Sequence, residues 1–298
     1  MIWLVGAKGM LGTEIARLLD FQKCNYYATG REVDVTDFDA ISNFVREKKI
    51  SWIINCSAYT AVDKAESDVI AAEKLNAQAP ENLAKLAKQI GAKLIHVSTD
   101  YVFDGSAKTP INEDSAISPC GIYGKTKAMG EKNIAETFDE FYILRTAWLY
   151  GWNGKNFVYT IIKAMNKNPS IKVVDDQFGT PTSAIDLAKV ILEIVKKNDC
   201  KKIPFGIYHC TDLGETSWYN FALEIKKIAE NLNILKNKDC VVNPCSTSKY
   251  PTAAKRPAYS VLDKTKIQSA LNIKLPNWKE SLLEFLQSPY FDLRFIQN

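Results

Sequence analysis

Tyr123 and Lys127 carry side chains that together could do acid–base chemistry on a carbonyl group. They lie four residues apart in a segment with a helical pattern, so both project from one face of that helix, about one turn apart. A tyrosine has an ordinary pKa of ~10, and a neighbouring ammonium favours its phenolate, which eases proton exchange at neutral pH. Such general acid catalysis contributes about 100- to 10,000-fold in rate. The same pair is common on solvated helix surfaces, so its meaning depends on its surroundings.

A third candidate, Thr99, lies 24 residues before Tyr123 and follows the β-branched run from Leu94 to Ser98. We interpret that run as a strand and place Thr99 and Asp100 at its carboxyl edge, where a doubly wound sheet binds its ligands. With a hydride donor beside it, Thr99 could hold a ketone while Tyr123 protonates the developing alkoxide. A strand-end hydroxyl that only caps a turn is the competing interpretation.

Gly6, Gly9 and Gly12 follow the first apolar run and open the first helical segment. At that place a dinucleotide pyrophosphate meets free backbone amides, and glycine permits the tight turn and the close approach. Three glycines alone also fit an ordinary turn; their position at the start of a βαβ unit favours a cofactor loop. The G-x-x-G-x-x-G spacing resembles that of the extended short-chain dehydrogenase/reductase superfamily.

The stretch from Thr29 to Val35 ends the second expected strand, where an acidic residue commonly binds the adenosine ribose. Arg31 could pair there with the 2′-phosphate of NADP(H), whereas Glu32 or Asp34 could serve NAD(H). We therefore favour NADP(H), with NAD(H) tolerated. A solvated turn of mixed charge is the alternative.

Short β-branched runs alternate with helical patterns through the first half of the chain, which is the rhythm of βαβ units. We expect an α/β fold with a doubly wound, Rossmann-type parallel sheet in a dinucleotide-binding domain at residues 1–150. Residues 151–298 should form mainly a smaller C-terminal α/β substrate-binding domain, interleaved with late sheet elements. The expected strands are 2–5, 26–29, 52–56, 94–98, 141–144 and 207–210, and the expected helices are 10–19, 38–48, 80–90, 123–138, 184–195 and 278–286.

The composition is that of a globular protein, with 24% charged and 46% apolar residues and a net charge of +4 spread along the chain. We expect neither a nucleic-acid nor a membrane partner. No segment approaches ~18 apolar residues and the first apolar run is too short for a signal peptide, so we expect a cytoplasmic protein. The seven cysteines, Cys200 among them, lack Cys-x-x-Cys spacing and fit reduced thiols. His96 and His209 are too few for a histidine metal site.

With these residues in view, the chain resembles the dTDP-4-dehydrorhamnose reductase family from residue 1 to about 287. The likeness rests on the glycine loop and on five further motifs. These are Asn-Cys-Ser-Ala-Tyr-Thr-Ala-Val-Asp-Lys-Ala-Glu at 55–66, Ser-Thr-Asp-Tyr-Val-Phe-Asp-Gly at 98–105, Tyr-Gly-Lys-Thr-Lys at 123–127, Arg-Thr-Ala-Trp at 145–148, and Arg256-Pro257.

The resemblance implies that Thr99, Tyr123 and Lys127 are catalytic and that Thr99 and Asp100 face the sugar. Trp148 is similar to the substrate-contacting tryptophan of the family, although a core aromatic would look the same. Arg256 is a candidate for the nucleotide diphosphate, with a salt-bridged surface arginine as the rival. The implied cofactor contacts are Gly6, Gly9, Met10, Leu11, Gly12, Arg31, Val97, Tyr123 and Lys127, with Ala58, Tyr59 and Thr60 near the ribose and pyrophosphate and Asp34 and Val35 at the adenine end.

The reaction that the resemblance implies is the last step of dTDP-rhamnose biosynthesis. A hydride passes from NADPH or NADH to C4 of dTDP-4-dehydro-β-L-rhamnose, and Tyr123 protonates the oxygen to give dTDP-β-L-rhamnose. The implied partner is a dTDP-linked 4-keto-6-deoxy sugar, and a homodimer is left open. Some relatives use a magnesium-bridged dimer. Glu14 matches one carboxylate there, but Ile185 stands where an acidic partner is wanted, so we expect no metal.

Two other functions share much of this pattern. A non-catalytic regulatory subunit with the same fold is one, because the beta subunit of methionine adenosyltransferase resembles the same family; the intact Thr99, Tyr123 and Lys127 argue against it. Another nucleotide-sugar reductase, an epimerase or a 4,6-dehydratase is the second. Tyr101 follows Thr99 and Asp100, where dehydratase chemistry would want an Asp-Glu pair, so reduction is favoured.

Overall fold

The computed structural model describes residues 1–198 and 203–297. Each expected strand and helix is present, with ends shifted by at most three residues. Cys200, expected as a reduced thiol, lies outside the described residues, whereas the other cysteines carry free thiols. Within the described ranges, no helix is both long and apolar enough to cross a membrane.

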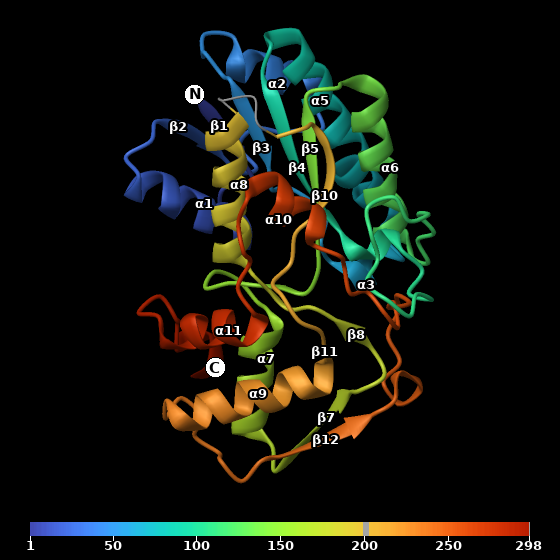
Figure 1. The fold of residues 1–298 in the computed structure, drawn as a ribbon, viewed down its shortest axis with the longest axis vertical. Coiled ribbons are helices and arrows are strands. Elements are labelled where there is room, and N and C mark those ends of the chain that lie inside the picture. Colours follow the sequence, from blue (N-terminus) through green and yellow to red (C-terminus); the bar gives the residue numbers. More distant parts are fainter. Residues whose placement is uncertain (199–202, 298) are drawn as a thin grey trace.

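Six parallel strands form the central sheet (Figure 1). They are β1 (Ile2–Val5), β2 (Tyr26–Thr29), β3 (Trp52–Asn55), β4 (Lys93–Thr99), β5 (Phe141–Thr146) and β10 (Gly206–His209). Their order is β10-β5-β4-β3-β1-β2, so the winding reverses between β1 and β3, as a doubly wound sheet requires. The register pairs Val5 with Asn55 and Thr99 with Thr146, which brings the carboxyl ends of the strands to one edge.

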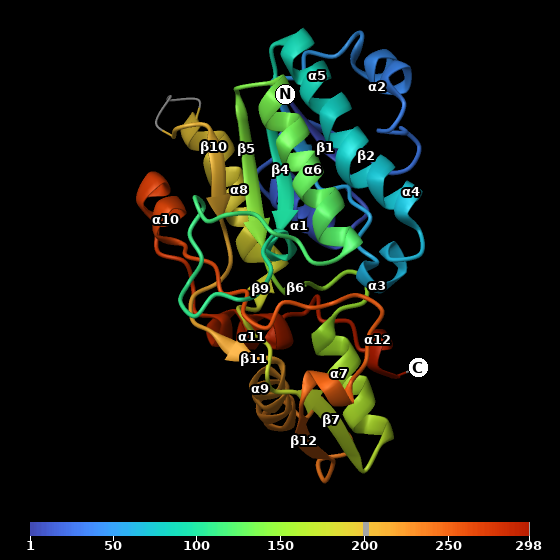
Figure 2. The ribbon, with the colours of Figure 1, turned by 90° about the vertical axis from the view of Figure 1, so that its right-hand side faces the viewer.

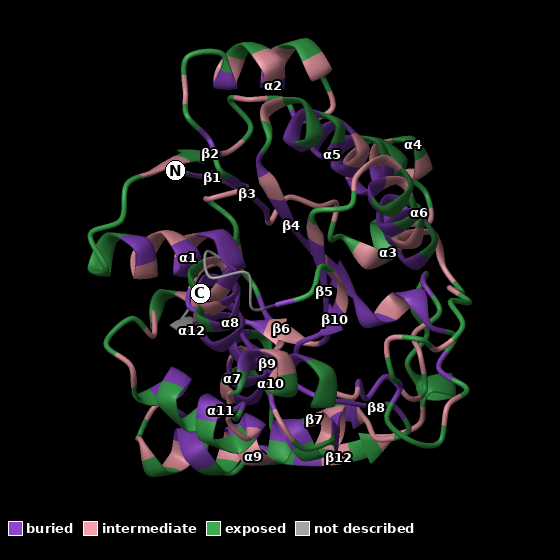
Figure 3. Ribbon diagram, turned by 45° about the horizontal axis from the view of Figure 1, so that its top comes forward, coloured by how far each residue is buried: buried purple, intermediate pink, exposed green. Residues whose placement is uncertain are grey.

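Helices cover both faces of the sheet (Figures 1 and 2). On one face lie α1 (Met10–Phe21), α8 (Ala184–Asn198) and α10 (Thr265–Leu271), and on the other α2 (Phe38–Val45), α5 (Ala79–Ile90) and α6 (Ile122–Thr137). Ile2 and Leu4 pack into the first layer, while Trp3 and Val5 pack into the second. Strands buried on both faces are mostly apolar, which explains runs such as Ile2–Val5, and Figure 3 shows most of their residues as buried.

A smaller layer lies beyond the carboxyl edge of the sheet, in the lower half of Figure 1. It contains α7 (Phe157–Lys167), α9 (Trp218–Asn231), α11 (Trp278–Gln287) and the parallel pair β7 (Ser170–Val174) and β12 (Val241–Cys245). Aromatic side chains dominate its core, where Tyr150, Phe221 and Phe285 pack together. The short pairs β6 (Leu149–Tyr150) with β9 (Thr182–Ser183) and β8 (Phe178–Gly179) with β11 (Thr216–Ser217) join this layer to the sheet.

Short helical pieces complete the chain. Between β3 and α5 come α3 (Val62–Ala65), α4 (Val69–Glu73) and a π-helical turn at Lys74–Gln78, and such π-turns often occur at functional sites. Two 3-10 turns occupy Asp100–Val102 and Thr247–Lys249, and α12 (Arg294–Gln297) ends the described chain.

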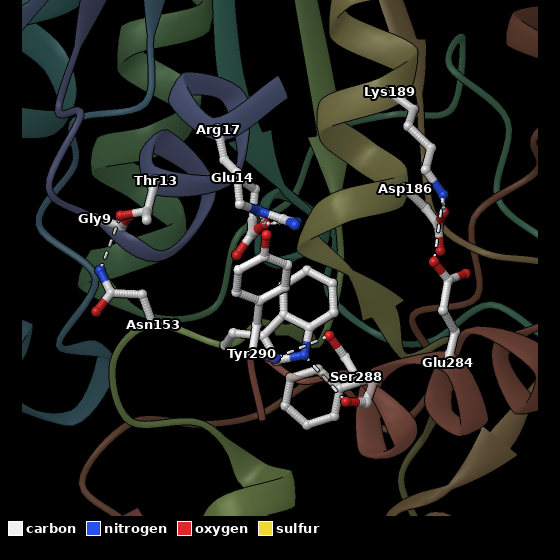
Figure 4. Close-up of polar contacts among 12 residues, drawn as sticks. Gly9, Thr13, Glu14, Arg17, Asn153, Asp186, Lys189, Glu284, Ser288 and Tyr290 are labelled. Carbon is white, nitrogen blue, oxygen red and sulfur yellow. Dashed lines mark hydrogen bonds and ion pairs between the residues drawn. The ribbon is translucent and has the colours of Figure 1, made fainter. Parts of the chain in front are cut away.

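Side-chain contacts fasten the segment after β6 to α1 (Figure 4). Asn153 donates from Nδ2 to Thr13 Oγ1 over 3.0 Å. The Arg17 guanidinium carbon lies 4.5 and 4.3 Å from the ring centroids of Trp152 and Tyr290. A cation over an aromatic ring contributes about 0.5 to 2 kcal/mol. These contacts hold the smaller layer against the helix that begins at the glycine loop.

A buried ion pair fixes α6 on the sheet. Arg145 of β5 and Glu131 of α6 are 1% and 3% exposed in their side chains and 2.7 Å apart. The Ser98 hydroxyl also donates to Glu131, and Arg145 donates to the Glu113 carbonyl over 3.4 Å. Both charges therefore have partners in a place without water, and α6 cannot shift without breaking them.

We predict that Glu131→Ala destabilises the fold by about 3 to 5 kcal/mol, because it leaves the Arg145 charge buried without its partner. Urea denaturation monitored by circular dichroism measures the change. Glu136→Ala is the matched control on the same helix, since its exposed pair with Lys132 contributes less than about 1 kcal/mol. Equal effects of the two substitutions would contradict the structural role of the buried pair.

Candidate active site

The carboxyl edge of the sheet gathers most of the candidate residues. The glycine loop follows β1, Arg31 follows β2, residues 58–60 follow β3, and Thr99 ends β4. Tyr123 and Lys127 arrive at the same edge on the first turns of α6, because α6 starts beside the end of β4. Parallel strands thus bring together residues that are more than a hundred positions apart in the sequence.

The glycine loop has the geometry of an anion site. Gly6 has a φ of 76°, and its N–H donates to the Thr29 carbonyl over 2.9 Å. A Cβ on Gly12 would lie 2.2 Å from the Gly6 carbonyl oxygen, so only glycine allows α1 to start this close to the loop. In the described chain, α1 begins at Met10 without a side-chain cap and without an acidic residue in its first turn. The amides of Met10, Leu11 and Gly12 can therefore hold a pyrophosphate.

The loop after β2 presents a cation. Arg31 is exposed, whereas the Glu32 carboxylate pairs with Lys8 over 3.3 Å and accepts the Gly30 N–H over 2.6 Å. These contacts hold the pKa of Glu32 below its usual range. Asp34 is likewise engaged, by Thr36, and Val35 is buried.

Ala58, Tyr59 and Thr60 lie on an open loop that a buried asparagine holds in place. Asn76, in the π-helical turn, accepts the Tyr59 N–H over 2.8 Å and donates to the Tyr59 carbonyl over 3.1 Å. It also donates to Thr126 of α6 over 3.1 Å. One side chain thus ties this loop to the helix that carries Tyr123.

The strand-end hydroxyl of Thr99 does cap a turn. Its Oγ1 accepts the Tyr101 N–H over 3.2 Å and donates to the Asp100 carboxylate over 3.0 Å. Asp100 is 2% exposed, and burial raises its pKa to about 6, although hydrogen bonds from Ser260 and Thr99 oppose the rise.

Tyr123 is half-buried against the edge of the Tyr101 ring, with 5.4 Å between ring centroids. Burial raises its pKa to about 12, opposed by a hydrogen bond from the Thr99 hydroxyl. The sequence predicted the opposite, a lowering of the Tyr123 pKa by Lys127. Desolvation dominates instead, because the Lys127 amine contacts residues of β4.

Lys127 is 1% exposed, and its described hydrogen bonds go to β4. Its Nζ donates to the Val97 carbonyl over 2.6 Å and lies 3.0 Å from His96 Nε2. Burial lowers the pKa of Lys127 to about 8, even though Glu131 acts in the opposite direction. A lysine in this setting can exchange its proton near neutral pH.

Trp148 and Arg256 lie on the side of the smaller layer. Trp148 has a φ of 48°, a strained conformation for a bulky residue and one that is often found at ligand sites. Its ring stacks on Trp218 with centroids 3.5 Å apart. Arg256 pairs with Asp63 through two hydrogen bonds of 3.0 and 2.9 Å and remains partly exposed, so the salt-bridged alternative describes its present contacts.

Glu14 and Ile185, the positions compared with the magnesium site of some relatives, do not lie together as a pair of carboxylates. The Glu14 carboxylate is already paired with the Arg17 guanidinium, which would repel a metal ion. Ile185 is buried and apolar and offers no ligand. Neighbouring Asp186 pairs with Lys189 over 2.9 Å (Figure 4). Among the residues that the structure describes, no group of three or more His, Cys, Asp or Glu side chains could hold a metal ion.

Sequence reasoning missed four residues that shape the site, namely Asn55, Asn76, His96 and Trp218. Asn55 and His96 are polar residues within apolar strand segments, and this contrast is the signal in the sequence that could have singled them out. The structure shows that the two residues are neighbours in register. Asn76 lies at the only π-helical turn in the described chain. Trp218 opens a helix for which no pattern was recognised.

Comparisons with known proteins agree with this geometry. The family model described as RmlD substrate binding domain matches residues 1–290. A dTDP-4-dehydrorhamnose reductase from Streptomyces griseus is 39% identical over 95% of this chain and 92% of its own length. The crystal structure of such a reductase from Clostridium acetobutylicum is 42% identical with a TM-score of 0.88, covering 96% and 98% of the two chains. The enzyme of that name from Bacillus anthracis, solved with NADP, is 34% identical with a TM-score of 0.87 over the same shares.

We predict that Asp100→Asn gains stability over the parent chain as the pH rises. The folded pKa of about 6 lies above the unfolded value of ~3.9, so the stability linked to Asp100 is complete below ~3.9 and is lost as the pH rises through 6. An asparagine does not ionise and avoids that loss. Urea denaturation at pH 4.5, 5.5, 6.5 and 7.5 measures the difference between the two chains.

Asp104→Asn is the matched control, because hydrogen bonds from Ser106 hold the pKa of Asp104 below its usual range. The difference in free energy of unfolding between Asp104→Asn and the parent chain should stay constant over this pH range. A constant difference for Asp100→Asn as well would show that Asp100 does not titrate as described.

Proposed function

The chain belongs to the family of dTDP-4-dehydrorhamnose reductases, and from that premise we propose that it reduces dTDP-4-dehydro-β-L-rhamnose at C4 to dTDP-β-L-rhamnose with NADPH or NADH. One observation supports this most strongly. Thr99 at the end of β4 and Tyr123 on the first turn of α6 lie at the carboxyl edge of the sheet, beside an anion site that only glycines permit.

The cofactor, when bound, supplies the hydride. Tyr123 gives its proton to the sugar oxygen, and Thr99 holds that oxygen in place before the transfer. The raised pKa of Tyr123 keeps the phenol protonated and ready to act as an acid. We assign the return of a proton to the remaining phenolate to Lys127, one turn further along α6.

The two domains suit different ligands of the proposed reaction, the cofactor and the sugar nucleotide. We assign the cofactor to the dinucleotide-binding domain at residues 1–150, where the glycine loop and residues 58–60 line the edge of the sheet. We assign the sugar nucleotide to the substrate-binding domain at residues 151–298, although β10 of that range lies in the sheet and α8 and α10 pack on it. Asp100, Trp148 and Arg256 face this junction in our assignment. The Arg256 guanidinium, which now pairs with Asp63, would then also donate to the diphosphate.

NADPH is the preferred cofactor in this proposal. The carboxylates near Arg31 are already engaged, Glu32 by Lys8 and Asp34 by Thr36, so they are poor acceptors for a ribose hydroxyl. The exposed Arg31 guanidinium suits a 2′-phosphate. A relative solved with NADP has the same fold at 34% identity.

The proposal uses one chain, so it allows a homodimer and needs none. It involves neither nucleic acid nor a membrane. A cytoplasmic location goes with it, because the described cysteines are free thiols, as a reducing compartment favours.

The direct test uses purified protein, NADPH or NADH, and dTDP-4-dehydro-L-rhamnose generated in situ, followed at the nicotinamide absorbance. Oxidation with formation of dTDP-rhamnose supports the proposal. No oxidation of either cofactor would favour the regulatory-subunit alternative. Turnover only of another nucleotide sugar would favour a different reductase or an epimerase.

We predict that Tyr123→Phe lowers kcat by at least about 100-fold and leaves the Kd for NADPH within about threefold, because it removes the acid and keeps the ring. Stopped-flow turnover and fluorescence titration measure the two quantities. Tyr26→Phe, at the opposite end of the sheet, is the control and should keep full activity. Full activity in Tyr123→Phe would remove Tyr123 from its role.

We also predict that Arg31→Ala raises KM for NADPH at least about tenfold and changes KM for NADH less than about twofold, because only NADPH loses a charged hydrogen bond. Steady-state kinetics with both cofactors at saturating sugar nucleotide measures this. Arg46→Ala, at the far end of α2, is the matched control. Parallel changes with both cofactors would mean that Arg31 does not contact the 2′-phosphate.

A further inference from the structure

A line of buried hydrogen bonds runs from the backbone after β3 to the amine of Lys127. The backbone N–H of Ser57 donates to Asn55 Oδ1 over 2.9 Å. Asn55 Nδ2 lies 3.0 Å from His96 Nδ1, and His96 Nε2 lies 3.0 Å from Lys127 Nζ. Asn55 and His96 are 1% and 0% exposed, so water cannot replace any partner in this line.

The first bond determines which way the Asn55 amide faces. A backbone N–H can only donate, so the amide oxygen must face Ser57 and the amide NH₂ must face His96. The Ser57 hydroxyl donates to the same oxygen and strengthens this orientation. His96 Nδ1 therefore accepts a hydrogen bond.

The next bonds determine where the imidazole proton lies. A neutral histidine carries one ring proton, and because Nδ1 accepts, that proton is on Nε2. Burial and the neighbouring Lys127 hold the pKa of His96 well below its usual range, so the ring is neutral. The Nε2–H consequently points at Lys127 Nζ, 3.0 Å away.

An ammonium has three donors and no acceptor, so it cannot accept this hydrogen. A neutral amine can: its lone pair accepts from His96, one N–H donates to the Val97 carbonyl, and the other N–H remains for the active site. The hydrogen-bond pattern is complete only for the uncharged lysine.

We propose that His96 is a positioning residue that stabilises the neutral amine form of Lys127 in the resting chain, by donating Nε2–H to its lone pair. The proposed reduction then draws its proton through Lys127. Tyr123 gives its proton to the sugar oxygen, Lys127 takes a proton from water, and that proton passes to the phenolate to restore the phenol. One proton from water is consumed with each hydride from the nicotinamide cofactor, so charge and atoms balance.

The charged groups around Lys127 do not reverse this preference. Glu131 on α6 favours the ammonium, but it is already paired with Arg145. Cys56, after β3, is a neutral thiol because burial raises its pKa to about 12. Tyr123, one turn earlier on α6, is a neutral phenol until turnover. Burial is the largest influence on Lys127 and outweighs Glu131 and Cys56, so the pKa of Lys127 is lowered to about 8.

The second histidine provides an internal control. His209 Nδ1 lies 3.0 Å from the Ile111 carbonyl, which can only accept, and Arg145 Nη1 lies 3.4 Å from His209 Nε2 and can only donate. His209 must therefore carry its proton on Nδ1. The chain has two histidines, and the structure gives them opposite tautomers.

The test is nitrogen-15 NMR of the imidazole rings in the full chain, labelled at histidine, between pH 6 and 8. We expect one ring with its proton on Nε2 and one with its proton on Nδ1, assigned by the loss of the first pattern in His96→Phe. A ring of His96 protonated on Nδ1, or on both nitrogens, would overturn the proposal. If His96→Phe does not fold, the parent chain still decides, because the proposal requires one ring of each tautomer and two rings protonated on Nδ1 would overturn it.

The amine is followed in the same way with lysine labelled at carbon-13 in the ε position, with Lys127→Arg for assignment. We expect Lys127 to titrate below the other lysines, and its midpoint to rise by about one pH unit, tenfold in proton affinity, in His96→Phe. Asn55→Asp should also raise it, because a carboxylate draws the His96 proton to Nδ1. A Lys127 midpoint unchanged in both variants would refute the role of His96.

The role in turnover rests on the proposed function, but neither NMR measurement uses a substrate. An inactive chain with the expected tautomers would refute the proposed function alone. An active chain with the opposite His96 tautomer would refute this inference alone.

Discussion

Parallel strands of one sheet end at the same edge, and the site depends on this constraint. Loops from four strands and the first turns of α6 meet there, although they are spread from Gly6 to Lys127 in the sequence. The constraint holds because the strands are buried on both faces and cannot shift in register without exposing apolar side chains. The Arg145–Glu131 pair adds a buried ionic connection that keeps α6, and with it Tyr123, against that edge.

Burial sets the proton affinities at this edge. It raises the pKa of Asp100 to about 6 and of Tyr123 to about 12, and it lowers that of Lys127 to about 8. Each shift favours the neutral form, so Asp100 and Lys127 change charge within about one pH unit of neutrality. The protonation of such groups can respond to the charge that a ligand or a reaction brings.

The sequence predicted the sheet well and the smaller layer poorly, for physical reasons. Runs such as Ile2–Val5 are buried on both faces, so their apolar pattern identifies them as strands from local sequence alone. Gly6 and Thr99 lie at the ends of such runs and can be located in the same way. The pair β7 and β12 joins residues about seventy positions apart, and only half-buried faces mark its strands, so no local pattern reveals it. Contacts such as Arg256 with Asp63, or Trp148 on Trp218, depend on that packing and are equally hidden. His96 was visible in the sequence, but its meaning depends on Asn55, its neighbour across the sheet.

The central claim is that this edge of the sheet delivers a hydride to C4 of a dTDP-linked keto sugar. Deuterium tracing tests it most directly: NADPH deuterated at the transferable C4 position is incubated with the chain and dTDP-4-dehydro-L-rhamnose, and the product is analysed by mass spectrometry and NMR. The account predicts one deuterium per product molecule, at C4 of dTDP-rhamnose. A product without deuterium, or deuterium at another carbon, would contradict it.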